Sequence, residues 1–453
     1  MPPLGSSPSV PSTAETRSMD FLRELAWRGL LHQTTSPELE GHLASGSRTG
    51  YCGFDPTSDS LTVGNLLPVM LLRRFQACGH RPVALLGGGT GLIGDPSGKS
   101  SERSLQSEEQ VAANLAGQRR ILERLLATDG PCGAIFVDNA EWLRRLGYLE
   151  VLRDVGKHFS VNAMIQRDSV ASRLEGREHG ISYTEFSYMV LQAYDFLHLH
   201  RAHGCTVQMG GSDQFGNIVS GIDLIRRMHA LEHGEGALES IAFGVTAPLL
   251  TAADGSKIGK TEKGAVWLSA ERTSPYRFHQ FWLNVADADA VRFLRWYTML
   301  SREAIDAIEA ECSARPQERA AQRTLAAEMT DLVHGPSERQ RAEAAAAAIF
   351  SGDLRALDAA TLSEVSEDLP SSGHELGALD DPGADLIELL VASGLAKSKR
   401  EAREFLASGA VSVNGEKADA ERRLRRSDLL DAGGQGVILL RRGRKQWHAT
   451  RWS

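Results

Sequence analysis

Short apolar runs alternate with longer stretches of helical periodicity along the first half of the chain. The apolar runs predict buried strands at 48–54, 82–86, 134–137 and 206–209. Apolar positions spaced three and four residues apart predict helices at 64–77, 108–127, 185–199 and 213–230. Strands that alternate with helices predict an α/β fold with a doubly wound parallel sheet.

Glycine-rich stretches follow three of these predicted strands. One comes directly after the first strand, and the others are 87–98 and 210–214. Ligands of doubly wound sheets bind beyond the carboxyl ends of the strands. We therefore expect the functional site at this edge of the sheet.

The second half of the chain has a different pattern. Residues 275–350 are mostly helical in periodicity, and an acidic stretch with Ser, Gly and Pro at 351–384 is typical of a linker with some local structure. Residues 385–409 predict two short helices. Residues 411–415 predict a strand that ends in an Asn-Gly hairpin turn.

Composition is that of a globular protein with more than one domain. A chain of 453 residues exceeds one compact core, and it contains no run of about 18 apolar residues, so a membrane span is not expected. The five cysteines are scattered and never form a Cys-x-x-Cys pair, which favours a reducing cytoplasm. Residues 1–18 are rich in Ser, Pro and Thr and predict a disordered extension, so either Met1 or Met19 is the start.

Charge is unevenly distributed. Residues 385–453 hold 14 Lys and Arg against 9 Asp and Glu, a balance of +5, whereas the whole chain carries −8. A basic module on an acidic body indicates a domain that meets phosphate groups.

Three local motifs resemble nucleotide-binding or metal-binding motifs, but their residues or spacing argue against those functions. The string 94–100 resembles a P-loop, but Ile93 stands where that motif needs its first glycine. The string 229–233 fits His-x-x-Glu-His but has no evident third ligand, and His198 and His200 point to different sides of a helix. We therefore predict no protein-bound structural metal.

Two signatures carry most of the chemical information. The first spans 51–57 and continues through 61–66, and the second is the Lys-Ile-Gly-Lys-Thr string at 257–261. Together with the stretches 91–99, 156–162 and 184–188, they resemble the bacterial tyrosyl-tRNA synthetases, which are class I aminoacyl-tRNA synthetases. The resemblance extends over nearly the whole chain after Met19.

This resemblance implies an organisation and an activity. It implies a disordered extension at 1–18, a Rossmann-like catalytic domain at 19–250, a connecting segment with the lysine-rich loop at 251–274, an α-helical anticodon-side domain at 275–350, a linker at 351–384 and a small α+β RNA-binding domain at 385–453. The implied enzyme is a homodimeric tyrosine–tRNA ligase of the cytoplasm. Its partners would be L-tyrosine, ATP with Mg²⁺, and tRNA(Tyr).

The residues expected to act on the phosphates come from both signatures and from the turn between them. They are Thr57, Thr62, Asn65, Lys99, Arg103, Lys257, Lys260 and Thr261. Tyrosine's carboxylate is already a nucleophile, so the first step needs no general base and depends on positioning and charge stabilisation. Lysines on a glycine-containing loop suit that role.

The resemblance also implies substrate contacts. Tyr51 and Asp195 match the pair that binds the phenol hydroxyl. The other expected tyrosine contacts are Asp95, Tyr188, Gln192, Gln208 and Gln214, and the expected ATP contacts are Gly53, Asp55, Gly64, Gly211, Asp213 and Lys260. Tyr188, Gln192 and Asp195 lie at i, i+4 and i+7, so they line one helical face.

One departure stands inside the first signature, which in this family usually reads His-x-Gly-His. Here Thr62 and Asn65 occupy the two histidine positions, and Phe215 replaces a usual Trp. The Thr62 hydroxyl is shorter than imidazole and cannot be cationic. The loss of one such donor costs on the order of 10²-fold in rate, so we expect Thr62 to slow adenylate formation without abolishing it.

The C-terminal module contributes the expected RNA contacts, which are Lys397, Lys399, Arg400 and Arg403. Contact with phosphate predicts salt-sensitive affinity. Two alternatives remain open. One is a paralogue that forms an aminoacyl-adenylate for another purpose or with another amino acid such as tryptophan; the other is an RNA-binding protein on a disabled synthetase body.

Overall fold

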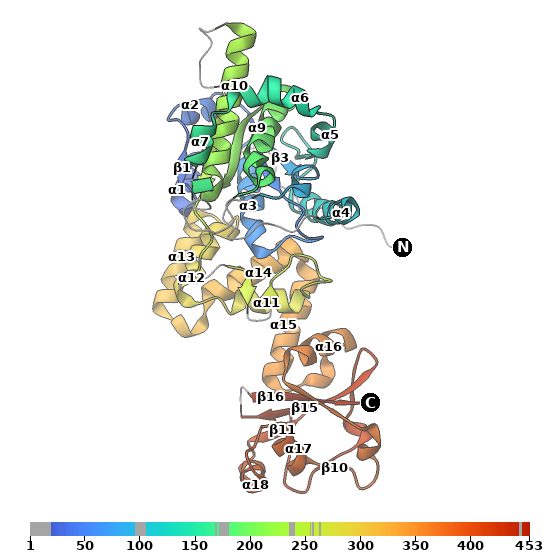
Figure 1. Ribbon diagram of the computed structural model, residues 1–453. Helices are drawn as coiled ribbons and strands as arrows, with labels where there is room; N and C mark the ends of the chain where they lie inside the picture. The colour runs from blue at the N-terminus through green and yellow to red at the C-terminus, as the bar shows by residue number, and fades with distance from the viewer. Residues whose placement is uncertain are drawn as a thin grey trace. The chain divides into compact units, whose positions relative to one another are not determined.

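The computed structural model of the chain describes residues 20–95, 106–167, 170–171, 181–234, 241–253, 255, 258–261, 264–443 and 446–453. The extension predicted at 1–18 lies outside these residues. The chain divides into two compact units, one within 1–272 and 285–325 and the other within 273–284 and 326–453 (Figure 1). Helix α14 (Ala320–Val333) contributes to both. In the described part of the chain, no helix is both long enough and apolar enough to cross a membrane.

The first unit is built on a six-stranded sheet. In spatial order its strands are β1 (Gln33–Thr34), β6 (Phe243–Ala247), β5 (Cys205–Gly211), β2 (Thr49–Phe54), β3 (Arg81–Leu86) and β4 (Ile135–Asp138). The five strands from β6 to β4 run parallel, which confirms the predicted sheet. Strand β1 pairs antiparallel with β6, so the sheet is mixed rather than wholly parallel. Its two residues are too few to show a strand periodicity in the sequence.

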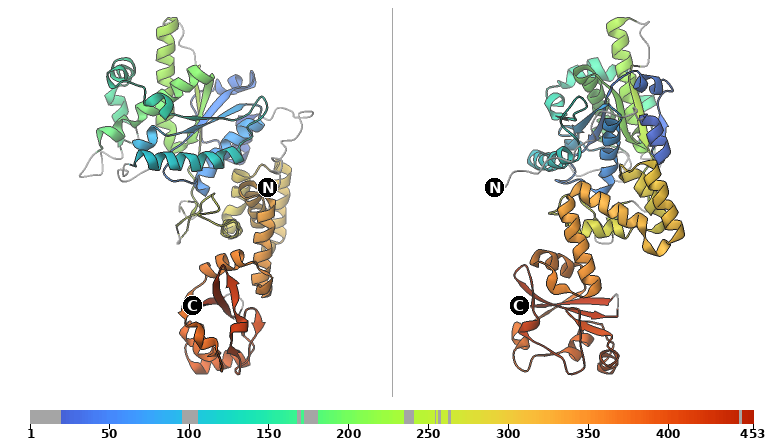
Figure 2. Two further views of the ribbon diagram at one scale, coloured as in Figure 1. Left: turned by 90° about the vertical axis from the view of Figure 1, so that its right-hand side faces the viewer. Right: turned by 180° about the vertical axis from the view of Figure 1, so that it is seen from behind.

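Helices cover both faces of this sheet (Figure 2). Successive strand residues point to opposite faces, and β2 shows which helix covers which. The Tyr51 ring packs against Phe196 of α9 (Tyr183–His203), with ring centroids 5.3 Å apart. A Cβ on Gly50 would lie 2.8 Å from the Phe75 ring of α3 (Val63–Ala77). Glycine at 50 therefore lets α3 approach the sheet closely.

The predicted helices form close to their expected limits. The remaining helices of the first unit are α1 (Phe21–Arg28), α2 (Leu39–Ala44), α4 (Glu108–Leu125), α5 (Ala140–Leu143), α6 (Tyr148–Glu150), α7 (Val161–Ile165), α10 (Phe215–His233), α12 (Asp287–Tyr297) and α13 (Arg302–Ala314). Ser107 and Ser182 accept backbone N–H bonds as the N-caps of α4 and α9, and Gly204 ends α9 in the left-handed conformation. A two-stranded hairpin of β7 (Lys260–Thr261) and β8 (Gly264–Ala265) follows the sheet.

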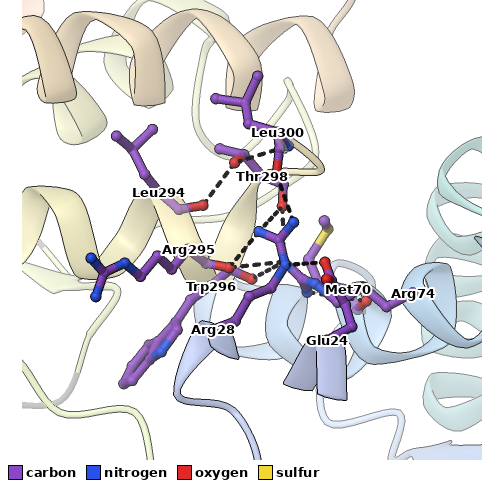
Figure 3. Close-up of polar contacts among 9 residues, drawn as sticks. All are labelled: Glu24, Arg28, Met70, Arg74, Leu294, Arg295, Trp296, Thr298 and Leu300. Atoms are coloured by element: carbon purple, nitrogen blue, oxygen red, sulfur yellow. Dashed lines mark hydrogen bonds and ion pairs between the residues drawn. The ribbon is translucent and has the colours of Figure 1, made fainter. Parts of the chain in front are cut away.

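Two buried arginines join α1 and α3 to the C-terminal end of α12 (Figure 3). Arg74 is fully buried and donates to the carbonyls of Arg295, Trp296 and Thr298 at 2.9–3.1 Å. Arg28 donates to the carbonyls of Arg295, Thr298 and Leu300 at 2.7–3.1 Å and to Glu24 at 2.5 Å. The last carbonyls of a helix lack intrahelical partners, and these guanidinium groups supply them.

The second unit combines helices with a curved sheet. Its helices are α11 (Pro275–Leu283), α15 (Pro336–Ser351), α16 (Ala359–Asp368), α17 (Leu386–Ala392) and α18 (Lys399–Ala407). Its main sheet has the order β12 (Glu416–Lys417), β11 (Val411–Val413), β15 (Gln435–Arg442), β16 (Gln446–Trp452) and β9 (Ser371–His374), with β14 (Leu430–Ala432) also paired to β15. A short ladder joins β10 (Ala384–Asp385) to β13 (Arg423–Leu424). The two expected helices after 385 and the Asn-Gly turn are confirmed, since Asn414 and Gly415 both have positive φ.

The stretch 351–384 is more than a linker, which corrects the prediction. It contains α16 and β9, and β9 pairs in parallel with β16. Leu354 and Leu362 are buried with Leu439 of β15 in one apolar cluster. Composition suggested a linker because polar residues surround these few apolar side chains. The helices of 275–350 are likewise shared between the two units, with α12 and α13 in the first and α11 and α15 in the second.

Candidate active site

Polar residues from four segments lie at the carboxyl edge of the parallel strands. Asp55 follows β2, and Asn139 follows β4. The turn 87–89 follows β3, and the turn 212–214 follows β5. Parallel strands end at the same edge of a sheet, so these segments surround one region.

Two buried polar atoms on adjacent strands lack a partner. Tyr51 of β2 pairs in register with Gln208 of β5, and their exposed fractions are 1% and 3%. The Tyr51 hydroxyl and the Gln208 Oε1 have no hydrogen-bond partner among the described residues. A buried polar group without a partner costs about 1–3 kcal/mol. Two such groups side by side indicate a place where a polar ligand supplies the missing bonds.

Asp195 of α9 is the buried acid of this region. Its oxygens accept from the Asn139 Nδ2 at 2.8 Å and from the Trp142 Nε1 at 2.8 Å. Burial raises the pKa of Asp195 to about 7, although both hydrogen bonds act to lower it. Burial and the nearby charge of Asp195 also raise the pKa of Tyr51. Tyr51 and Asp195 therefore interact electrostatically within this buried region.

Asn139 and Trp142 are site residues that sequence reasoning missed. The Asn139 amide group donates to Asp195 and to the Thr90 Oγ1 at 3.0 Å, and its oxygen accepts from the Gly89 N–H at 2.7 Å. It therefore ties the glycine turn after β3 to the buried acid. The available signal was the position of Asn139 directly after a predicted parallel strand, where polar side chains face the ligand edge.

The other residues of the α9 face belong to a second network. Gln192 Nε2 donates to the Gln214 Oε1 at 3.2 Å, and Gln214 Nε2 donates to the Asp95 Oδ2 at 2.8 Å. Asn217 Nδ2 donates to the Gln192 Oε1 at 2.9 Å and extends the network into α10. The structure thus brings Asp95, Gln192 and Gln214 together from three distant parts of the sequence.

Tyr188 connects the same helix to the end of β2. Its hydroxyl donates to the Asp55 Oδ2 at 3.2 Å, and Asp55 also accepts from the Thr90 Oγ1 at 3.3 Å. Burial raises the pKa of Tyr188 well above its ordinary value. Tyr188 is therefore a neutral hydrogen-bond donor at the ligand edge.

Two glycines at this edge of the sheet, Gly53 and Gly211, leave room for different groups. A Cβ on Gly53 would meet open space, so a ligand can approach the backbone there. A Cβ on Gly211 would lie 2.4 Å from the Asp213 carboxylate, so glycine at 211 accommodates that carboxylate. Gly53 and Gly211 are both among the residues expected to contact ATP.

The segment directly after the second signature is joined to the first signature by backbone hydrogen bonds, although the two lie about 200 residues apart in sequence. The Val63 N–H donates to the Val266 carbonyl at 3.0 Å, and the Leu268 N–H donates to the Leu61 carbonyl at 2.8 Å. Gly259 has a φ of +81°, and a Cβ there would lie 3.3 Å from Val63. Gly259 of the second signature therefore lies against Val63 and Gly64 in the first turn of α3.

Thr62 and Asn65 form the N-terminal cap of α3. The Asn65 Oδ1 accepts from the Thr62 N–H at 3.0 Å and from the Thr62 hydroxyl at 2.8 Å, while the Thr62 Oγ1 accepts from the Asn65 N–H at 3.4 Å. This reciprocal arrangement is a capping box. The two departures from the family signature are therefore coupled to each other.

Several expected site residues are not described. Lys99, Arg103 and Lys257 lie outside the described residues, and for Lys260 and Thr261 only the backbone in β7 is described. Thr57 is exposed, and its carbonyl accepts from the Gln106 Nε2 at 3.3 Å.

The histidines singled out in the sequence have other roles. His229 stacks on His233 with ring centroids 4.2 Å apart, and His198 stacks on Trp142 at the same distance. The His200 Nδ1 lies 3.0 Å from the Cys205 carbonyl. No group of three or more acidic, histidine or cysteine side chains in the described ranges is arranged to hold a metal ion.

The four residues expected to contact RNA lie on and next to α18 (Lys399–Ala407). Lys399 forms an ion pair with Glu388 at 2.7 Å, and Arg400 forms one with Glu404 at 3.0 Å. Lys397 and Arg403 are exposed. Elsewhere in this unit, the Arg441 guanidinium lies over the Trp447 ring at 5.0 Å from its centroid.

Similarity to known proteins agrees with this arrangement. Residues 45–351 match the family described as tRNA synthetases class I (W and Y), and residues 362–450 match the tyrosine--tRNA ligase SYY-like C-terminal domain. The chain is 49% identical over 438 residues to the tyrosine--tRNA ligase of Geobacillus kaustophilus, covering 96% of this chain and 100% of that one. It is also 49% identical over 433 residues to the tyrosine--tRNA ligase of Roseiflexus castenholzii, covering 95% and 99%.

A solved structure shares the fold of about three quarters of the chain. The C-terminally truncated mitochondrial tyrosyl-tRNA synthetase of Aspergillus nidulans has a TM-score of 0.65 and 30% identity, and the match covers 73% of this chain and 94% of that one. Two family matches that together span most of the chain, and relatives matched over their full length, lead to one conclusion: the chain belongs to the tyrosine–tRNA ligase family of class I tRNA synthetases.

Proposed function

We propose that the protein is a tyrosine–tRNA ligase. The carboxylate of L-tyrosine attacks the α-phosphorus of ATP, the bond to the β-phosphate breaks, and pyrophosphate leaves. A ribose hydroxyl at the 3′ end of tRNA(Tyr) then attacks the tyrosyl carbonyl, and AMP leaves. The observation that carries this proposal is the buried pair of Tyr51 and Asp195, in which the Tyr51 hydroxyl has no partner among the described residues.

Recognition of the phenol follows from this pair. The substrate hydroxyl donates to Asp195 and accepts from the Tyr51 hydroxyl, so both buried groups are satisfied. Asn139 and Trp142 hold the Asp195 carboxylate in place from its far side. Phenylalanine would leave the buried Tyr51 hydroxyl unpaired and would offer no donor to Asp195, which is the basis of discrimination.

The remaining groups bind the rest of the substrates. Asp95, held by Gln214, lies in the network expected to bind the ammonium group together with Tyr188 and Gln192. Gln208 has an acceptor available for the bound tyrosine. ATP lies along Gly53, Asp55, Gly64, Gly211 and Asp213, with its Mg²⁺ as part of the substrate.

Charge that builds up on the phosphates requires cations and donors at fixed positions. We assign this role to Lys257, Lys260 and Thr261 of the second signature, with Thr57, Thr62, Asn65, Lys99 and Arg103. Gly259 lies against Val63 at the start of α3, and the Val63 N–H donates to the Val266 carbonyl just after the second signature. This contact supports a shared phosphate site.

We further infer a cytoplasmic homodimer with its RNA contacts on the second unit. Five free cysteines are compatible with a reducing compartment. Lys397, Lys399, Arg400 and Arg403 are the proposed contacts to tRNA phosphate. Exposed apolar side chains between 148 and 183 support the dimer; they are Tyr148 (63% exposed), Leu149 (78%), Leu152 (44%), Val161 (56%), Ile165 (41%) and Tyr183 (62%).

Tyrosine-dependent exchange between ATP and labelled pyrophosphate tests the function. We expect exchange with tyrosine and at least 100-fold less with phenylalanine or tryptophan, because removal of partners from several buried polar groups costs about 3 kcal/mol or more. Initial exchange rates of the purified protein without tRNA are the measurement. A folded protein that binds tRNA but exchanges with none of the three amino acids would instead be the RNA-binding relative; preference for another amino acid would indicate the paralogue.

The variant Thr62→His tests the departure in the first signature. We expect faster adenylate formation, because imidazole reaches further and can carry a positive charge. The same change removes an N-cap, so the unfolding free energy should fall by about 1 kcal/mol. Single-turnover adenylate formation and urea unfolding separate the two effects. An unchanged rate contradicts the proposed catalytic effect of Thr62.

Tyrosine affinity should depend on the protonation of Asp195. The pKa of its carboxyl in the free protein is raised to about 7, so the group is protonated below that pH and cannot accept from the phenol as a carboxylate. We expect tyrosine to bind about tenfold more weakly at pH 6 than at pH 8. Equilibrium dialysis across this range measures it, and Asp195→Asn should bind weakly at both values. A flat profile for the unmodified protein contradicts this role.

The variant Leu149→Glu tests the dimer. A charge in an apolar interface is unpaired when buried, so this variant should sediment as a monomer at micromolar concentration whereas the unmodified protein sediments as a dimer. Leu231→Glu is the matched control, since Leu231 is 64% exposed on α10 and lies outside the proposed surface. Equal behaviour of the two variants in analytical ultracentrifugation would place any interface elsewhere.

A further inference from the structure

The segment that leads into the second signature is held by two side chains from the first two turns of α12. The Asp289 carboxylate accepts from the Ala253 N–H with both oxygens, each at 3.1 Å. Arg292 donates to the Thr251 carbonyl at 2.9 Å and also forms an ion pair with Asp289. These contacts join residues 251–253, four residues before Lys257, to a helix more than 30 residues further along the chain.

Asp289 is unusual among the acids of this helix. Its side chain is 4% exposed, whereas Asp287 in the same turn is 82% exposed and contacts Gln322 and Arg319 instead of the loop. A carboxylate in the first turn of a helix is favoured by the helix dipole whether buried or exposed. The helix dipole therefore explains why an acid occupies the first turn of α12. It does not explain why Asp289 is buried, or why both of its oxygens accept from the Ala253 N–H.

The exit of the same segment is fixed differently. After Lys260, the Val266 carbonyl accepts from the Val63 N–H, and the Leu268 N–H donates to the Leu61 carbonyl. These exit contacts are between backbone groups, so substitution of a side chain leaves the bonding atoms in place. The entry contacts through Asp289 and Arg292 depend on side chains and can be removed individually.

The contacts that hold the entry and the exit of this segment are connected to each other through α3 and α12. Helix α3 holds the exit at Val63, and α12 holds the entry at Asp289. The C-terminal end of α12 is in turn bound to α3 by Arg74, and the Tyr297 hydroxyl donates to the Val63 carbonyl at 3.4 Å. The distance between the two ends of the lysine-bearing segment is therefore set by the packing of α3 against α12.

We propose that Asp289 and Arg292 are positioning residues for adenylate formation. They fix the entry of the segment that carries Lys257 and Lys260, and so determine where these lysines meet the pyrophosphate end of ATP. They touch no substrate themselves, and the tyrosine pocket at β2 and α9 shares none of their contacts. This inference rests on the proposed ligase function, which assigns the lysines to the phosphates.

The variant Asp289→Asn tests the proposal, with Asp287→Asn as its matched control. Misplacement of a catalytic group by about 1 Å can cost on the order of 10²-fold, so we expect the maximal rate of tyrosine-dependent pyrophosphate exchange to fall at least tenfold in Asp289→Asn. The dissociation constant of tyrosine should stay within twofold of that of the unmodified protein. Asp287→Asn should change neither quantity. Equal exchange rates in the two variants, or parallel loss of tyrosine binding and exchange in Asp289→Asn, overturn the proposal.

Limited proteolysis does not require enzyme activity, so it tests the positioning role of Asp289 and Arg292 separately from the ligase function. Release of the entry should expose Lys257 and Lys260, so limited trypsin digestion followed by mass spectrometry should show at least fivefold faster cleavage after these lysines in Asp289→Asn than in Asp287→Asn. Arg292→Lys, which keeps the charge beside Asp289 but shortens the reach to Thr251, should shift cleavage in the same direction. Absence of exchange in the unmodified protein would refute the ligase function alone; unchanged cleavage in both variants would refute the positioning role.

Discussion

The packing of α3 against α12 depends on two guanidinium groups that are buried at the end of a helix. Arg74 and Arg28 lie together with one carboxylate, Glu24, beside them, so the cluster carries more positive than negative charge. Burial lowers the pKa of Arg74 to about 9, which shows the cost of removing this cation from water. The carbonyls that end α12 offset that cost, because they form the negative end of the helix dipole and lack other partners. Since α3 begins at the first signature, the position of that signature follows from this contact.

The sequence predicted the parallel strands and the main helices because their periodicity is local. Elements that depend on distant partners were missed. Strand β1 has two residues, and β9 exists through pairing with β16, more than 70 residues later. The same limit applied to the site. Family resemblance indicated Tyr51 and Asp195, whereas Asn139 and Trp142, which hold Asp195, required the packing of α5 against α9. The coupling of Thr62 to Asn65 needed the cap geometry, although their spacing of three residues is that of a capping box.

The proposed tyrosine pocket contains buried polar groups whose hydrogen bonding is incomplete before a ligand binds. The Tyr51 hydroxyl and the Gln208 Oε1 are buried without partners in the described part of the chain, and Asp195 has a pKa raised far above that of an exposed acid. Each of these groups destabilises the ligand-free protein to some degree. A tyrosine side chain can restore these interactions at once, whereas an amino acid without the hydroxyl cannot. In the proposed function, selectivity for tyrosine therefore comes from the desolvation of a few fixed groups.

Thr62 and Asn65, which stand where the family usually has histidines, also affect both the stability of the fold and the proposed chemistry. Threonine is a better N-cap than histidine, and Asn65 completes the reciprocal bonds that fix the first turn of α3. That turn also binds the Val266 carbonyl through the Val63 N–H, so its rigidity helps to hold the exit of the lysine-bearing segment. In the proposed function, a weaker phosphate donor at position 62 therefore accompanies a firmer first turn of α3. The side chain at position 62 and the anchoring of the lysine-bearing segment then act on the same step, which is adenylate formation.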